Sequence, residues 1–190
     1  MSYFPAYIKL NNKKILIIGA GKIAHEKLKH LLDFTDSITV LGTVATKEIK
    51  STVHTYNLKL IEKSYEKNDM NGYDIVIVAI DDINKQKEIY FEAKEKKILC
   101  NTVDVTEFCD FIFPSYIKKG DLTISVSTSG ASPAVAKYLR KYIENLLPKG
   151  IDIFLKEMRD LRKKLPKGKN RMKFFDTKAK KFFDKGIKNE

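Results

Sequence analysis

The sequence predicts an α/β fold in which a doubly wound parallel sheet is followed by a short two-stranded segment and by C-terminal helices. Apolar runs without polar alternation, at residues 15–18, 38–41 and 73–80, are typical of parallel strands buried on both faces. Segments with helical spacing of apolar residues separate these runs, as in right-handed crossover connections. A chain of 190 residues can bury a core for one such domain and a smaller appendage.

The elements before residue 64 begin with an expected short edge strand at residues 7–10, followed by a central strand at residues 15–18. A helix is expected from Lys22, because apolar side chains recur at helical spacing as far as Leu32. The elements that follow are a strand at 38–41, a helix at about 45–56 and a strand at about 58–63.

The fourth strand, at residues 73–80, is too apolar for any position but a central one. It ends at Asp81 and Asp82, which can cap a helix at about 84–96, and a fifth strand follows at 98–103. Ligands of doubly wound sheets bind at the carboxyl ends of the strands. The sequence therefore predicts one site where these ends converge, formed by Gly19 to Lys22, Thr43, Asp81, Asn101, Val103 and Asp104.

After Asp110 the pattern changes to two strands, at 111–117 and 122–128, joined by a hairpin turn at 119–121. An exposed two-stranded ribbon is marginally stable alone, so we expect it to pair with a second copy of the chain.

The last part of the sequence is expected to be helical. Ser132 and Pro133 are typical N-cap and N1 residues of a helix that runs to about Leu146. Two amphipathic helices, separated at 165–168, complete the chain. We therefore expect three parts, at residues 1–113, 114–148 and 149–190.

The glycine pair after the first strand is the strongest functional signal. Gly19 and Gly21 allow a sharp turn and a close approach of the backbone to a ligand, and Ala24 allows the strand and the helix to pack closely. The helix that starts near Lys22 would direct its unpaired N–H groups at a pyrophosphate. The pattern predicts a Rossmann-type dinucleotide site, with a purely structural turn as the alternative.

The residue that usually holds the ribose is missing. A carboxylate is expected roughly 20 residues after the glycines, at the end of the second strand. This strand is followed by Gly42, Thr43 and Val44, and the nearby Lys47 is suited to a 2′-phosphate. The residues alone leave NAD and NADP as alternatives.

Candidates for chemistry are few. Asp104 follows the fifth strand, at the mouth where a nicotinamide ring would lie, and its carboxylate can accept a proton during hydride transfer. The alternative is a turn aspartate that caps the backbone of Thr106 or Glu107. We expect surface or structural roles for His25, His30 and His54, and we find no nucleophilic triad and no metal-ligand spacing.

The hydroxyl-rich loop at residues 127–133 leads into a helix N-terminus, an arrangement suited to carboxylates. The alternative is an ordinary capped helix.

Charge and cysteine content limit the class of protein. The net charge is +12, and the last 40 residues carry 14 Lys and Arg side chains against six Asp and Glu. Such a surface can bind nucleic acid, anionic lipid or a polyanionic small molecule, or it can be a set of solvated helix faces. Cys100 and Cys109 are expected to be buried free thiols. With no secretory segment and no run of about 18 apolar residues, we expect a cytoplasmic protein without a membrane partner.

Four motifs, in this order and spacing, resemble the precorrin-2 dehydrogenases of sirohaem synthesis, which include the N-terminal part of sirohaem synthase. They are Gly19-Ala20-Gly21-Lys22-Ile23-Ala24, Cys100-Asn101-Thr102-Val103-Asp104, Phe111-Ile112-Phe113-Pro114 and the segment 122–133. The resemblance extends over the whole chain. It implies an NAD-binding domain, a dimerisation segment and a helical domain, assembled as a homodimer.

The resemblance also implies oxidation of precorrin-2, a polycarboxylate tetrapyrrole, to sirohydrochlorin with NAD as the hydride acceptor. The family's catalytic aspartate corresponds to Asp104. Its dinucleotide contacts correspond to Gly19, Gly21, Lys22, Ile23, Thr43 and Val44. Its tetrapyrrole-binding loop corresponds to Thr128, Ser129, Gly130 and Ser132, and Ser129 replaces a glycine of the family pattern.

Some members of this family also insert Fe²⁺ into sirohydrochlorin, and this activity stays open here. No histidine follows His54, but Asp104 can serve as the base for metal insertion. The methyltransferase domain of the long synthases is absent, so we expect the chain not to make precorrin-2 itself.

The rival functions are a non-catalytic NAD-sensing module and a nucleic-acid binder, and no base-reading motif supports the second.

Overall fold

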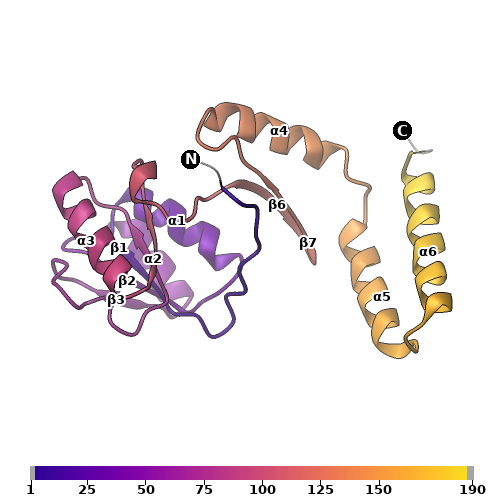
Figure 1. The fold of residues 1–190 in the computed structure, drawn as a ribbon, viewed down its shortest axis with the longest axis horizontal. Coiled ribbons are helices and arrows are strands. Elements are labelled where there is room, and N and C mark those ends of the chain that lie inside the picture. The colour runs from indigo at the N-terminus through magenta and orange to yellow at the C-terminus, as the bar shows by residue number, and fades with distance from the viewer. Residues whose placement is uncertain (1–2, 188–190) are drawn as a thin grey trace. The chain divides into compact units, whose positions relative to one another are not determined.

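The computed structural model describes residues 3–187, which belong to two compact units that meet in the sequence between Ile112 and Phe113 (Figure 1). The first unit holds a five-stranded parallel sheet with the strand order β3-β2-β1-β4-β5. The strands are β1 (Ile15–Ile18), β2 (Ile38–Leu41), β3 (Lys59–Ile61), β4 (Ile75–Val78) and β5 (Leu99–Thr102). The predicted doubly wound α/β fold is confirmed.

The three central strands are buried throughout, as their apolar runs predicted. Ile17 of β1 lies opposite Val40 of β2 and Ile77 of β4. Helices on both sides remove these strands from water, so every position is apolar except Thr39 in β2. Burial of this kind contributes about 25 cal/mol per Å² of apolar surface, which makes the sheet the core of the unit.

Three helices cover the sheet: α1 (Lys22–Leu32), α2 (Lys47–Thr55) and α3 (Ile83–Glu95). A hydrogen-bond contact of 3.0 Å between His25 Nε2 and Thr52 Oγ1 joins α1 to α2. Helix α3 packs on β5 and β4, and its Ile89 and Ala93 belong to the buried cluster that also holds Val76 and Val78 of β4. Asp82 caps α3 as predicted, because its carboxylate accepts hydrogen bonds from the N–H groups of Asn84 and Lys85.

The edge strand predicted at residues 7–10 is wrong. Both edges of β1 are already paired, with β2 on one side and β4 on the other, so no edge is left for a preceding strand. Residues 3–14 form no strand, and Tyr7 and Ile8 remain exposed. The chain turns at Asn12, which adopts a positive φ of 64°.

The second unit begins with a hairpin of β6 (Ser115–Lys119) and β7 (Leu122–Val126), followed by α4 (Pro133–Asn145), α5 (Ile151–Lys164) and α6 (Lys169–Ile187). The predicted turn is confirmed at Gly120, which has a φ of +58°. Helix α4 contacts both strands of the hairpin. The rings of Phe154 in α5 and Phe182 in α6 stack with their centroids 4.1 Å apart, so these aromatic residues pack the two helices together.

Among residues 3–187, no helix combines the length and the apolar character that a membrane crossing requires.

Candidate dinucleotide-binding site

The glycine turn after β1 is pressed against the ends of the neighbouring strands. Gly19 has a φ of +118°, which favours glycine, and its N–H donates to the carbonyl of Leu41 at 2.7 Å. A Cβ added at Gly19 would lie 2.1 Å from the carbonyl oxygen of Ala79. The carboxyl ends of β1, β2 and β4 therefore meet backbone to backbone, and Gly19 places no side chain between them.

Gly42 explains why the ribose-binding acid is missing. This residue directly follows β2, where the fingerprint places a carboxylate. A Cβ added at Gly42 would lie 2.8 Å from the Cβ of Ala20 and 2.9 Å from its backbone nitrogen. No acidic side chain fits at this position, so the first exposed side chains after β2 are those of Thr43 and Val44.

Gly21 differs from Gly19 because nothing lies within 4 Å of a Cβ added there. It is the N-cap residue of α1 and has an extended backbone, and no side chain caps the helix. The first N–H groups of α1 are therefore left for a ligand, which is the arrangement that binds phosphate in dinucleotide sites. Lys22 and Ile23 lie in this first turn, and both are exposed. The residues present fit a bound dinucleotide.

A cavity of about 390 Å³ adjoins the glycine turn at Gly19 and Ala20. Four of the predicted cofactor residues line it: Gly19, Thr43, Val44 and Asp81. The other predicted residues, Gly21, Lys22, Ile23, Asn101, Val103 and Asp104, lie outside its lining. The lining also includes four polar or aromatic residues that the sequence did not single out as site residues: Lys63, Ser64, Tyr65 and Lys85. The cavity is therefore formed by the ends of β1, β2 and β4 together with the segment after β3.

Lys63 places a positive charge in this wall. Its ammonium lies 2.8 Å from Asp69 and 3.2 Å from Glu66. The hydrogen bond to Asp69, despite some desolvation, raises the pKa of Lys63, which keeps it a cation. The rule that ligands bind at strand ends would have found this residue, because Lys63 closes the segment predicted as the third strand.

The end of β5 is held by the chain that returns beside it. Asn101 is buried, and its side-chain amide donates to the carbonyl of Phe111 at 2.8 Å. The thiol of Cys109 donates to the carbonyl of Thr102 at 3.1 Å. Asp110 accepts from the N–H of Cys100 at 3.0 Å and pairs with Lys94. Asn101 is thus a structural tie, and contact of Asn101 or Val103 with a cofactor stays a prediction.

Asp104 lies in the turn between β5 and a single 3₁₀ turn at Thr106–Phe108. Its side chain is exposed and its φ is +64°. The carboxylate acts electrostatically on Lys27 of α1: burial lowers the pKa of Lys27, and the negative charge of Asp104 opposes that shift. Asp104 is therefore an exposed anion associated with the helix that starts at the glycine turn.

The hydroxyl-rich loop of the second unit is internally bonded. Thr128 Oγ1 donates to the carbonyl of Ser132 and accepts from its N–H, both at 3.1 Å. Ser132 caps α4 as predicted, because its Oγ accepts from the N–H of Val135 at 3.3 Å. Ser129 and Gly130 are exposed and have positive φ values of 52° and 87°. The loop is thus held by hydrogen bonds between Thr128 and Ser132, while Ser129 and Gly130 face solvent.

Two other predictions concern the cysteines and metals. Cys100 is a buried free thiol as predicted, whereas Cys109 is only half-buried. Within the described part of the chain, no group of three or more His, Cys, Asp or Glu side chains is arranged to hold a metal ion.

Comparisons with known proteins agree with the division of the chain. Residues 6–115 match the family described as "Putative NAD(P)-binding", and residues 119–146 match the family "Sirohaem biosynthesis protein central". The siroheme synthase of Psychrobacter arcticus is 32% identical over 198 residues, which cover all of this chain and 36% of that protein. The siroheme synthase of Methylococcus capsulatus is 34% identical over 165 residues, covering 87% of this chain and 35% of that protein.

The structure of "SirC, precorrin-2 dehydrogenase" superposes with a TM-score of 0.72 at 23% identity, over 89% of this chain and 85% of that one, and so shares the fold. The chain spans about a third of the length of the curated relatives that it matches. The chain therefore belongs to the family formed by the N-terminal region of sirohaem synthases, in which an NAD(P)-binding domain precedes the sirohaem biosynthesis central domain.

Proposed function

We propose that the chain is an NAD-dependent precorrin-2 dehydrogenase that forms sirohydrochlorin for sirohaem biosynthesis. The observation that carries this proposal is the glycine turn with its open Gly21 and uncapped α1, in a chain related to sirohaem synthases. When bound, NAD would supply the hydride acceptor. We further propose that residues 1–113 bind the dinucleotide, 114–148 mediate dimerisation and 149–190 form a helical domain.

The side chains of the first unit have separate roles in this proposal. The N–H groups at the start of α1 hold the pyrophosphate, and Thr43 and Val44 lie beside the adenosine ribose. Asp104 accepts the proton that precorrin-2 releases as it loses a hydride. Its solvent exposure leaves the carboxylate accessible to a substrate.

The second unit offers a receptor for carboxylates. The exposed backbone at Ser129 and Gly130 precedes the N-terminus of α4, whose dipole attracts anions. Thr128 and Ser132 hold this loop in one conformation, so a polycarboxylate substrate need not order it on binding. We infer that this loop binds the acidic side chains of the tetrapyrrole.

A homodimer accounts for the apolar face of α4. Val135, Tyr138, Leu139 and Tyr142 recur at helical spacing and are between 43% and 69% exposed. A contiguous apolar face of this kind marks an interaction surface. Because the adjoining hairpin has only two strands, a second copy of the chain would stabilise both elements together.

Anaerobic incubation of the purified chain with precorrin-2 and NAD tests the proposal. We expect reduced nicotinamide and sirohydrochlorin to appear together in equal amounts, and neither to appear when the dinucleotide is omitted. Parallel reactions with NADP measure cofactor preference, and later addition of Fe²⁺ measures metal insertion through the absorption spectrum. Binding of NAD without turnover would instead favour a non-catalytic NAD-sensing module.

A further inference from the structure

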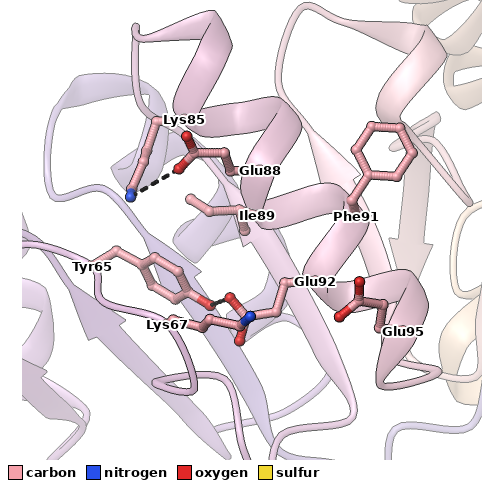
Figure 2. Close-up of a pocket in the computed structure, with 8 residues that line it drawn as sticks. All are labelled: Tyr65, Lys67, Lys85, Glu88, Ile89, Phe91, Glu92 and Glu95. Carbon is pink, nitrogen blue, oxygen red and sulfur yellow. Dashed lines mark hydrogen bonds and ion pairs between the residues drawn. The ribbon is translucent and has the colours of Figure 1, made fainter.

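Helix α3 carries a buried carboxylate that the proposed reaction does not use. Glu92 is only 8% exposed, although an ionised carboxylate is costly to bury without partners. One of its oxygens accepts from the hydroxyl of Tyr65 at 2.9 Å, and the other accepts from the N–H of Asn68 at 2.8 Å. Figure 2 shows the Tyr65 hydroxyl directed at Glu92 across a groove beside α3. Lys96 adds a weaker ion pair at 3.8 Å.

Both hydrogen bonds hold the segment that follows β3, which we call the β3 loop (residues 62–69). The β3 loop needs such an anchor because β3 is an edge strand of three residues, paired only with β2. Lys96, the residue that follows α3, also donates from its Nζ to the side-chain oxygen of Asn68 at 2.9 Å, which ties the same loop to the end of the helix. These hydrogen bonds join residues that are 24 to 28 positions apart in the sequence, and together they fasten the loop to the helix.

The β3 loop is also a wall of the dinucleotide cavity. Lys63, Ser64 and Tyr65 line that cavity on one side, and Tyr65 lines the groove beside α3 on the other. The groove has a volume of about 290 Å³, and the hydrogen-bonded side chains of Tyr65 and Glu92 both line it (Figure 2). Because Tyr65 borders both hollows, a shift of its ring would change the shape of the cavity.

Tyr65 is suited to a permanent anchor. Burial, and then the hydrogen bond to Glu92, raises the pKa of the phenol above its ordinary value. Its hydroxyl therefore keeps its proton and goes on donating at physiological pH. Hydrogen bonds to charged groups are among the stronger ones in proteins, so this contact restrains the loop more than a neutral pair would.

We propose that Glu92 is a positioning residue for dinucleotide binding, which acts through Tyr65 and Asn68 to hold the wall formed by Lys63, Ser64 and Tyr65 in its binding conformation. This inference rests on the proposed function, because it concerns the same dinucleotide cavity. If the loop leaves that conformation for part of the time, the apparent dissociation constant for the dinucleotide rises in proportion.

The test measures the Kd of NAD by calorimetry on the full chain and on the variants Tyr65→Phe, Glu92→Ala and Glu92→Gln. Circular dichroism confirms that each variant is folded at the temperature used. Glu95→Gln is the matched control, because Glu95 is exposed, lines the same groove from the same helix and loses the same charge. We expect Tyr65→Phe and Glu92→Ala to raise the Kd about fivefold or more, and Glu95→Gln to leave it unchanged.

The conservative variant and the double variant separate positioning from general stability. Glu92→Gln can still accept from Asn68 and donate to the Tyr65 oxygen, so its Kd should rise less than that of Glu92→Ala. The double variant Tyr65→Phe/Glu92→Ala should bind NAD little more weakly than Glu92→Ala alone, because each substitution removes the same Tyr65–Glu92 hydrogen bond. An unchanged Kd in folded Tyr65→Phe would overturn the inference, even if Glu92→Ala does not fold. A wild-type chain that binds neither NAD nor NADP would contradict the proposed function instead.

Discussion

The backbone of Gly19 lies directly against the carbonyl group of Ala79, so that an added Cβ would stand 2.1 Å from the Ala79 oxygen. This contact joins the end of β1 to the end of β4, where the N–H of Ala79 also donates to the carbonyl of Ile18 at 2.7 Å. Two backbones can approach so closely only where one residue has no side chain. The contact forms the floor of the proposed dinucleotide cavity.

Replacing Gly19 with alanine should destabilise the fold. The new Cβ would meet backbone atoms that cannot move without opening the sheet, and the φ of +118° is strained for alanine. We expect the free energy of unfolding to fall by about 3 kcal/mol or more, as measured by urea denaturation. A loss below about 1 kcal/mol would show that the strand ends are not packed in this way.

Replacing Gly21 with valine should instead affect binding alone. The space around Gly21 is open, and its backbone is extended, as valine prefers. We expect the free energy of unfolding to change by less than about 1 kcal/mol, while the Kd of NAD rises about tenfold or more, because the side chain occupies the pyrophosphate position. Undiminished NAD affinity in this variant would contradict the assignment of the phosphate site.

Ser129→Gly should stabilise the chain slightly. Ser129 has a φ of +52°, which costs a residue with a side chain about 1 kcal/mol relative to glycine. Its N–H donates to Ser127 Oγ, a bond that glycine keeps. The greater conformational freedom of glycine in the unfolded chain offsets part of this gain. We therefore expect the free energy of unfolding to rise by about 0.5 kcal/mol, which urea denaturation would show as a higher midpoint. A lower midpoint would mean that the Ser129 side chain contributes a stabilising contact.

The stability of the chain should depend on the ionisation of Cys100 at alkaline pH. Burial raises the pKa of this thiol to about 12, so from about pH 9 upward the unfolded chain releases a proton that the folded chain keeps. The contribution is therefore complete below about pH 9 and is lost as the pH rises toward 12. Urea denaturation should show the free energy of unfolding declining less steeply with pH in Cys100→Ala, by up to about 1.4 kcal/mol per pH unit. Parallel declines in the two proteins would contradict the burial of the thiol.

The sheet was predictable because its strands are marked by local composition. The apolar runs of β1, β2 and β4 follow directly from burial on both faces, and Asp82 was recognisable as a cap from its place before a helix. The strand expected at 7–10 fails because pairing is a competition between segments. The turn at residues 11–14, which suggested this strand, says nothing of β2 and β4, which take both edges of β1.

Apart from Lys63, the wall that the β3 loop contributes to the cavity was not predictable from local patterns. Tyr65 and Glu92 are 27 residues apart, and their hydrogen bond depends on how the β3 loop returns to α3. Nothing in the sequence indicated that the side-chain amide of Asn101, at the end of β5, donates to the carbonyl of Phe111, and its contact with a cofactor stays a prediction. Strand ends predict where a ligand binds, but long-range hydrogen bonds decide which side chains face it.

The most direct test of the account is the turnover of Asp104→Asn. Asparagine is nearly isosteric and tolerates the φ of +64° at this position, so the turn should be preserved while the proton acceptor is lost. We predict that oxidation of precorrin-2 falls by a factor of about 10² to 10⁴, whereas the Kd of NAD stays within about twofold of the wild-type value. Sirohydrochlorin formation at the wild-type rate in this variant would contradict the proposed reaction at Asp104.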